Sequence, residues 1–323
     1  MVTKDQFAAA ALPAAAARPH RPHRRRQKAG NSLTWRSAGL IVPFAVIFFL
    51  FLILPIGYAV YQSFLGQQSS GLGLGPSTTV FAGLSNYWSA ITSPQFGAGI
   101  GRVAIFGLIN IPLTIGLALL FALILDASAI PCRGLFRVIY FLPYAIPGVV
   151  GGILWAFLYQ PQLSPYSDML SALGAGQVNL LSTNMVIWSI ANIVVWEFAG
   201  YNMLILTATL NAIPAEQYEA ARIDGCGRVR EAIRIKIPQL RPALVMTVLF
   251  AIIGTLQLFN EPLVLSLVTK SVTTTYTPNF MSYTEAFSND DYYFAAAISV
   301  ILAVITAALS FIFLTVVNRR AAR

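Results

Sequence analysis

Six long apolar runs dominate the sequence and limit what the chain can fold into. Each is about 20 residues or longer, the length that an α-helix needs to cross about 30 Å of hydrocarbon. The runs cover roughly Gly39–Phe64, Gly97–Leu125, Leu135–Tyr159, Asn184–Leu210, Ala243–Val268 and Phe294–Val317. Backbone polar groups in lipid must bond internally, and runs that are continuous rather than alternating exclude a β-barrel. The sequence predicts an all-α polytopic membrane protein with six transmembrane helices.

Composition excludes several classes of protein. Hydrophobic residues make up 57% of the chain and charged residues 10%, whereas charged residues are about 25% of a typical soluble domain. Both histidines, His20 and His23, precede the first apolar run, and the two cysteines belong to no ligand cluster. The sequence has no Gly-Lys dipeptide and therefore no GxxxxGK phosphate loop. We expect no catalytic residue, no metal site and no bound cofactor in this chain.

Positive charge is concentrated on one side of the predicted bundle. All but two of the 21 lysines and arginines lie before the first run, between runs two and three or at the start of the third, between runs four and five, or after the sixth. The two exceptions are Arg102 and Lys270. By the positive-inside rule, both termini are predicted to be cytoplasmic. The net charge of +9 then reflects topology and attraction to anionic membrane lipid, so we expect no nucleic-acid partner.

The predicted membrane domain covers residues 39–318. Residues 1–38 are rich in alanine, proline and arginine and are expected to form a disordered, basic cytoplasmic tail. A secretory signal is the alternative for this segment, but the first apolar run is too long for a cleaved signal. Residues 319–323 are expected to form a short cytoplasmic tail. Prolines such as Pro143 and Pro147 are expected to kink or end the helices that contain them.

The predicted cytoplasmic connection over residues 211–242 has a structure of its own. Residues that favour helix starts, stops and breaks occur in the order Asn211, Pro214, Asp224, Gly225, Pro238 and Pro242. They predict a first helix that is capped by Asn211 and ends at Asp224-Gly225, and a second helix over Arg228–Lys236 that Pro238 and Pro242 break before the fifth run. A connection that only joined two spans would not need these elements. The alternative is an amphipathic helix that rests on lipid.

This connection resembles the EAA loop of ABC importer permeases. The pattern is Glu-Ala-Ala, three residues, Gly, nine residues, Ile, one residue, Leu, Pro. The matching residues here are Glu219, Ala220, Ala221, Gly225, Ile235, Ile237 and Pro238, with isoleucine where leucine is usual. The stretches Phe141–Pro143, Trp196–Asn202 and Phe259–Asn260 are similar to the carbohydrate-uptake group of maltose and sn-glycerol-3-phosphate type. The resemblance covers roughly residues 40–317 and implies a type I importer permease fold.

The resemblance implies that the Glu-Ala-Ala helix couples the chain to a cytoplasmic ATPase. In the family this helix docks into a cleft on the ATPase subunit, and its glutamate commonly pairs with an arginine there. The residues expected to carry this role, or to shape the helix and its turn, are Tyr218, Glu219, Ala220, Ala221, Ile223, Asp224, Gly225, Ile235 and Pro238. ATP and magnesium would be bound by the partner ATPase.

Polar side chains inside the fourth and fifth runs are candidates for a substrate path. They are Trp196, Glu197, Tyr201, Asn202, Gln257, Asn260 and Glu261. Intramembrane carboxylates usually face a cavity or a partner, and each of the pairs Glu197–Tyr201 and Gln257–Glu261 would share a helix face. Aromatic faces beside amide and carboxylate groups suit a sugar. The alternative is a structural role, because Asn and Gln also hold membrane helices together.

We therefore expect the permease subunit of an ATP-driven importer for a sugar, oligosaccharide or polyol, in a prokaryotic plasma membrane. The implied partners are a second permease of different sequence, an ATPase homodimer and an extracytoplasmic solute-binding protein. The outer loops Gly66–Phe96 and Gln160–Thr183 are candidates to receive that binding protein, and the second should hold a short helix near Tyr166–Leu173. The alternatives are a permease for sn-glycerol-3-phosphate or a related phosphodiester, and an ion-coupled secondary transporter.

Overall fold

The computed structural model describes residues 35–69, 77–127, 131–160, 163–172, 174 and 178–321. The chain divides at Leu52 into two compact units. In the first, helix α1 (Trp35–Phe48) runs into the π-helix η1 (Phe49–Ile53). Most of the predicted N-terminal tail lies outside the described residues, but α1 already begins within the segment that was expected to be disordered.

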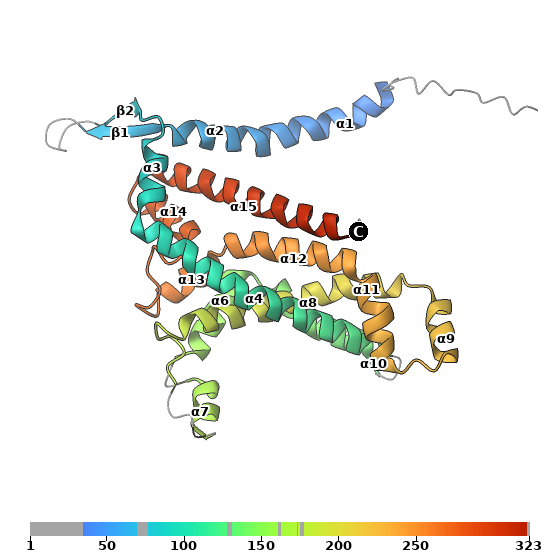
Figure 1. Cartoon of the computed structure of the whole chain (residues 1–323). Coiled ribbons are helices and arrows are strands. Elements are labelled where there is room, and N and C mark those ends of the chain that lie inside the picture. The colour runs from blue at the N-terminus through green and yellow to red at the C-terminus, as the bar shows by residue number, and fades with distance from the viewer. Residues whose placement is uncertain are drawn as a thin grey trace, which may run out of the picture. The chain divides into compact units, whose positions relative to one another are not determined.

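The second unit contains the remaining elements (Figure 1). In chain order they are α2 (Leu54–Ser63), β1 (Leu65–Ser69), β2 (Ser77–Phe81), α3 (Ser85–Thr92), α4 (Pro94–Asp126), α5 (Arg133–Phe141), the 3₁₀ helix η2 (Leu142–Ala145), α6 (Gly148–Leu158), α7 (Pro165–Ala172), α8 (Val186–Asn211), α9 (Ala215–Ile223), α10 (Arg228–Glu231), the π-helix η3 (Ala232–Lys236), α11 (Ile237–Gln239), α12 (Arg241–Leu256), α13 (Asn260–Ser266), α14 (Pro278–Phe287) and α15 (Tyr292–Ala321).

The helices match the predicted apolar runs. Among the described residues, five helices are long and apolar enough to cross a membrane, and the pair α5 and α6 makes a sixth if it counts as one bent span. The predicted short helix in the 160–183 loop is confirmed as α7. At the C-terminal end, α15 continues to Ala321, so the predicted tail at 319–323 begins as helix.

The loop that follows the first span contains strands and a helix. Strands β1 and β2 form an antiparallel hairpin in which Leu65 pairs with Phe81 and Ser69 with Ser77. Helix α3 follows the hairpin directly. The loop is therefore folded over much of its described length, and it adds a small β element to an otherwise helical chain.

Two of the spans are broken at proline-rich or polar segments. Helices α5 and α6 meet at an angle of 94°. Pro143 lies in the first turn of η2 and Pro147 is the N-cap of α6, which agrees with the prediction that these prolines end helices. The second break lies between α12 and α13 at Gln257–Phe259.

Side chains from α14 and the residue before it satisfy the backbone exposed by the second break. The Thr277 hydroxyl donates a hydrogen bond to the Leu258 carbonyl at 3.0 Å, and the Asn279 amide donates one to the Gln257 carbonyl at 3.0 Å. An unpaired backbone group at membrane depth would cost several kcal/mol, so non-helical backbone persists there only where protein or a cavity satisfies it.

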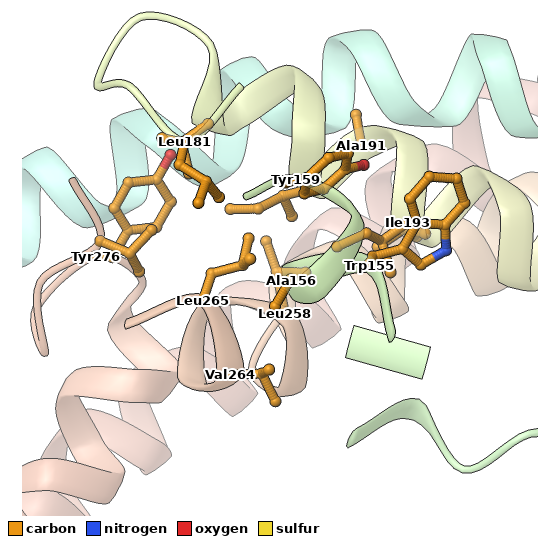
Figure 2. Close-up of a cluster of buried hydrophobic side chains, with 14 of the residues drawn as sticks. Trp155, Ala156, Tyr159, Leu181, Ala191, Ile193, Leu258, Val264, Leu265 and Tyr276 are labelled. Atoms are coloured by element: carbon orange, nitrogen blue, oxygen red, sulfur yellow. The ribbon is translucent and has the colours of Figure 1, made fainter. Parts of the chain in front are cut away.

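Helix α8 is the most buried of the membrane helices and lies along α4 (Figure 1). A cluster of buried apolar side chains joins α6, α8 and α13, and Figure 2 shows its members Trp155, Ile193 and Leu265 with their neighbours. A second cluster joins α4, α8 and α12 around Met203 and Leu206. These two clusters hold the helices that surround the site described below.

Glycine at position 200 permits a very close contact between two helices. The α-carbon of Gly200, on α8, lies so near the backbone of α5 that a Cβ would overlap the Tyr140 carbonyl oxygen. Tyr140 in turn stacks on Phe121 of α4, with ring centroids 4.4 Å apart. Because the neighbour is backbone rather than a flexible side chain, the site cannot relax locally.

We predict that Gly200→Ala destabilises the fold, because the added methyl group forces α5 away from α8. Overpacking of this kind typically costs about 1–3 kcal/mol. The measurement is the apparent melting temperature of the purified chain in detergent. Gly116→Ala is the matched control, since Gly116 lies in the long helix α4 with no atom within 4 Å of its Cβ position. Equal melting temperatures for the two variants would contradict the contact.

Candidate functional site

A cavity of about 410 Å³ opens between the broken spans. It is lined by α4, η2, α8, α12, the break at Gln257–Phe259 and α13. The lining residues are Phe106, Asn110, Thr114, Tyr144, Val194, Phe198, Tyr201, Asn202, Phe250, Ala251, Gly254, Thr255, Gln257, Leu258, Phe259, Asn260 and Glu261. Both helix breaks therefore contribute to one site.

One wall of the cavity is aromatic. The Tyr144 ring on η2 stacks on the Tyr201 ring of α8, with centroids 4.4 Å apart and planes 17° apart. Phe198 meets Tyr144 edge-on, with centroids 5.7 Å apart and planes at 70°. Since the two rings on α8 lie almost one turn apart, the kinked segment η2 rests against a continuous aromatic face of that helix.

The other polar groups of the lining are amides and hydroxyls. Asn110 and Thr114 are buried one turn apart on α4, and the Thr114 hydroxyl donates a hydrogen bond to the Asn110 side-chain oxygen at 3.2 Å. The Asn202 amide donates to the Phe198 carbonyl at 2.9 Å. Gln257 and Asn260, at the break, are exposed. The described lining residues include no lysine, arginine or histidine.

Glu261 is the only charged residue in the described lining, and Glu197 lies near it outside the lining. Both are buried, and the two carboxyl groups lie close to one another. The Oε1 atom of Glu197 also lies against α6, where a Cβ at Gly151 would be 2.6 Å away. A glycine at position 151 is thus what leaves room for the Glu197 carboxyl between α6 and α8.

The structure brings five of the seven predicted path residues to the cavity. They are Tyr201, Asn202, Gln257, Asn260 and Glu261. Of the other two, Glu197 contacts Glu261, and Trp196 packs edge-on against Trp155 in the core with centroids 5.6 Å apart. The prediction that Gln257 and Glu261 share one helix face is wrong, because the helix is interrupted between them.

Sequence reasoning missed Asn110, Thr114, Tyr144 and Phe198. Asn110 and Thr114 carried a usable signal, since two polar side chains four residues apart in an apolar run lie on one helix face. Tyr144 and Phe198 carried no such signal. Tyr144 reaches the cavity only because the third span bends at η2.

The predicted coupling loop folds into α9, α10, η3 and α11. Helix α9 ends at Ile223, and Gly225 follows in the left-handed conformation with φ of 74°, which confirms the predicted stop. The predicted start is wrong: Asn211 is the last residue of α8, and Pro214 is the N-cap of α9. The second predicted helix continues past Pro238 to Gln239, and Leu240 separates it from α12, so it is broken between Pro238 and Pro242 as predicted.

Most of the predicted coupling residues are accessible. Glu219, Ala220, Asp224, Gly225 and Pro238 are exposed. Ile223, at the end of α9, is 88% exposed, an unusual position for a large apolar side chain. Tyr218, Ala221 and Ile235 are half-buried. The exposed part of α9 thus combines a carboxylate, a small residue and an isolated apolar side chain.

Tyr218 points back toward an ion cluster that the sequence did not reveal. The Lys236 ammonium lies 2.6 Å from Asp126 Oδ2 and 2.9 Å from Glu231 Oε1. It also lies 5.2 Å from the centre of the Tyr218 ring. The cluster borders a cavity of about 510 Å³ between the end of α4, α9 and α10, which Arg222 and Arg228 also line.

Burial and charge shift the pKa values in this cluster. Burial, together with the nearby Asp126 carboxylate, raises the pKa of the Tyr218 hydroxyl. For Lys236, burial acts to lower the pKa, but hydrogen bonds to Asp126 and Glu231 outweigh it and raise the pKa above its usual value. Lys236 therefore stays protonated through neutral pH and well into the alkaline range.

The fold is a set of membrane helices with a cavity between two broken spans, and one connection carries the short helices α9 to α11. These features are those of a transport permease. Residues 118–323 match the family described as "Binding-protein-dependent transport system inner membrane component", and the chain belongs to this family. The predictions of an ABC importer permease and of a multi-pass protein of the plasma membrane are thereby confirmed. Family membership also sets aside an ion-coupled secondary transporter.

Several relatives cover most of the chain. The diacetylchitobiose uptake system permease protein NgcF of Streptomyces coelicolor is 28% identical over 307 residues, which is 91% of this chain and 85% of NgcF. The sn-glycerol-3-phosphate transport system permease protein UgpA of Agrobacterium fabrum is 29% identical over 274 residues, which is 84% of this chain and 90% of UgpA.

A solved structure shares the fold. It is that of a bacterial ABC transporter involved in the import of the acidic polysaccharide alginate, and one of its chains matches with a TM-score of 0.73 at 21% identity. The match covers 88% of this chain and 96% of the other. A second structure of a bacterial alginate ABC transporter, in complex with an alginate-bound periplasmic protein, matches with a TM-score of 0.70 at 20% identity over 86% of this chain and 92% of the other.

We predict that amine acylation at pH 8.5 labels Lys270 and leaves Lys236 largely unlabelled. Only the neutral amine reacts, and Lys236 is both buried and held protonated by two carboxylates, whereas Lys270 is exposed. The measurement is the modified fraction of each lysine by peptide mass spectrometry on the intact chain in detergent. Asp126→Asn should increase labelling of Lys236. Equal labelling of the two lysines in the unchanged chain would contradict the ion cluster.

Proposed function

We propose that this chain is the translocating subunit of an ATP-driven importer for a neutral sugar, oligosaccharide or polyol. The observation that carries the proposal is the chemistry of the cavity between the spans. Its volume of about 410 Å³ lies within the range of about 300–1,000 Å³ that is usual for small-molecule sites. Stacked tyrosines offer flat surfaces to the C–H faces of a sugar, and Asn, Gln and Thr side chains offer donors and acceptors to its hydroxyls.

The charge of the lining favours a neutral substrate over an anionic one. A phosphate or carboxylate would be expected to meet arginine or lysine, which bind such groups with charge-assisted hydrogen bonds. The described lining has neither, and Glu261 would repel an anion. The relative that takes up diacetylchitobiose agrees with a neutral oligosaccharide.

The second candidate is a permease for sn-glycerol-3-phosphate or a related phosphodiester. The similarity to UgpA favours it. For this candidate the positive charge would have to come from the second permease, since the cavity in this chain does not supply it.

The exposed face of α9 supports a coupling role toward a separate ATPase. In this proposal Glu219 pairs with a basic residue of the ATPase, Ala220 allows close approach and Ile223 fills an apolar socket. The ATPase binds ATP and magnesium, and its closure moves α9. Since α8 leads directly into the loop that carries α9, this movement reaches the cavity and alternates its opening between the two sides of the membrane.

The assembly that we propose contains two permeases of different sequence, two ATPase subunits and an extracytoplasmic solute-binding protein. One solved relative contains a bound periplasmic protein, which supports the last of these partners. The outer hairpin β1–β2 with α3, and the loop that holds α7, are the surfaces that we assign to it.

The substrate class is tested by uptake in source cells that lack this chain and carry it back on a plasmid. We expect loss and restoration of uptake for at least one labelled neutral substrate among diacetylchitobiose, maltose and glucitol, with uptake of sn-glycerol-3-phosphate unchanged. Tyr201→Ala should raise KM by roughly twofold to tenfold through lost stacking, whereas Tyr201→Phe keeps the ring and the uptake. Dependence of sn-glycerol-3-phosphate uptake alone on this chain would favour the second candidate.

The coupling role is tested by Glu219→Lys. Reversing one charge of a desolvated interfacial pair costs about 2–5 kcal/mol, so we expect the variant to lose copurification with the ATPase and to lose transport. Glu216→Lys is the matched control, because it makes the same change on an exposed residue of the same helix. Membrane levels of both variants are checked by immunoblot. Normal transport by Glu219→Lys would refute the assignment.

A further inference from the structure

The coupling helix is tied to its surroundings by side-chain links that its own sequence motif does not include. Gln239 on α11 donates a hydrogen bond to Gln217 on α9 at 2.6 Å, in an exposed position. The second link is inside: the Tyr218 ring packs on the Lys236 ammonium. A movement of α9 would therefore displace α11 and the ion cluster first.

Lys236 joins elements that are distant in the sequence. Its ammonium pairs with Asp126, the last residue of α4, and with Glu231 on α10. The three side chains are between 9% and 17% exposed. One cation held between two partly buried carboxylates is a much firmer contact than an exposed ion pair, whose contribution is about 0–1 kcal/mol.

The backbone is shaped to produce this contact. Glu231 and Lys236 are five residues apart, which would place them about 140° apart around an ordinary α-helix. The segment between them, Ala232–Lys236, is instead a π-helix, whose hydrogen bonds join residues five apart and so bring both side chains to one face. Such turns are frequent at functional sites.

Asp126 connects the cluster to the cavity between the spans. It ends the same helix, α4, that carries the cavity residues Asn110 and Thr114. Between these points α4 is packed against α8 and α12 through a buried apolar cluster, so the helix moves as a stiff body with its neighbours. A displacement of Asp126 is thereby carried to the wall of the cavity.

We propose that Lys236 is a positioning residue that transmits the movement of α9 to α4, through Tyr218 on one side and Asp126 on the other. The inference rests on the proposed function, because it assigns a second route by which the movement of α9 reaches the cavity. The first route is the chain itself, from α9 back into α8. With Lys236 in place, α4 and α8 move together, and the two cavity walls that they form keep their position relative to one another.

The test uses the whole importer, with the ATPase and binding protein purified together with this chain and reconstituted in proteoliposomes. Three quantities are measured: ATPase subunits bound per permease, ATP hydrolysed, and substrate transported per ATP. The variant is Lys236→Met, which keeps the length of the side chain and removes the charge. Arg234→Met is the matched control, since Arg234 is an exposed cation two residues earlier.

We expect Lys236→Met to bind the ATPase and to hydrolyse ATP as the unchanged chain does, but to transport at least about fivefold less substrate per ATP, the lower end of ordinary coupling effects. Lys236→Arg should recover part of the ratio. A merely structural role would lower assembly and hydrolysis together and leave the ratio alone. A ratio for Lys236→Met equal to that of Arg234→Met would overturn the inference.

A second variant decides the outcome if Lys236→Met does not assemble. Asp126→Asn weakens only the contact to α4 and leaves Lys236 paired with Glu231 and packed on Tyr218. It should show the same loss of transport per ATP, and an unchanged ratio would overturn the inference. Absence of ATP-dependent uptake by the unchanged chain would instead defeat the proposed function, so the two failures are distinguishable.

Discussion

Backbone hydrogen bonding in hydrocarbon is the constraint on which the rest of this structure depends. A membrane helix can be interrupted only where other groups bond the freed carbonyls and amides, and here both interruptions meet that condition. Thr277 and Asn279 bond the carbonyls at the break in the fifth span, and the break in the third falls at Pro143 and Pro147, neither of which has a backbone N–H to satisfy. The segment around α14 thus helps to maintain the break that borders the cavity.

The breaks create the site because each one turns side chains away from the lipid and toward a common space. Tyr144 reaches Tyr201 only through the bend at η2, and Asn260 and Glu261 begin a new helix, α13, after the interruption that follows α12. Glycine at positions 151 and 200 lets α6 and α5 come close to α8. A bundle of unbroken helices with the same composition would pack these polar groups against neighbours and leave no path.

The sequence predicts this architecture well where one local rule decides the outcome. The length of the apolar runs locates the spans. Gly225 ends α9 because the backbone there takes the left-handed conformation, which glycine adopts without strain. Prediction fails where tertiary contacts decide. Nothing local marks Gln257 as the end of α12, since the break depends on Thr277 and Asn279, twenty residues further on. Likewise, Asp126 and Lys236 are far apart in sequence, and the π-helix that aligns Lys236 with Glu231 has no recognised sequence signal.

Charge is divided between the two ends of the proposed mechanism in a way that each end requires. The described lining of the cavity holds a single carboxylate and no lysine, arginine or histidine. A neutral sugar would therefore make weak, exchangeable contacts there, which permit both entry and release. The coupling loop over residues 211–242 holds half of the charged residues in the second half of the chain, and in the proposed mechanism its short ion pairs transmit the displacement. Had the ionic contacts been in the cavity, substrate would be held too firmly to pass. Had the loop relied on apolar contacts alone, α9 and α4 would slide past one another during the stroke, because apolar contacts are not directional.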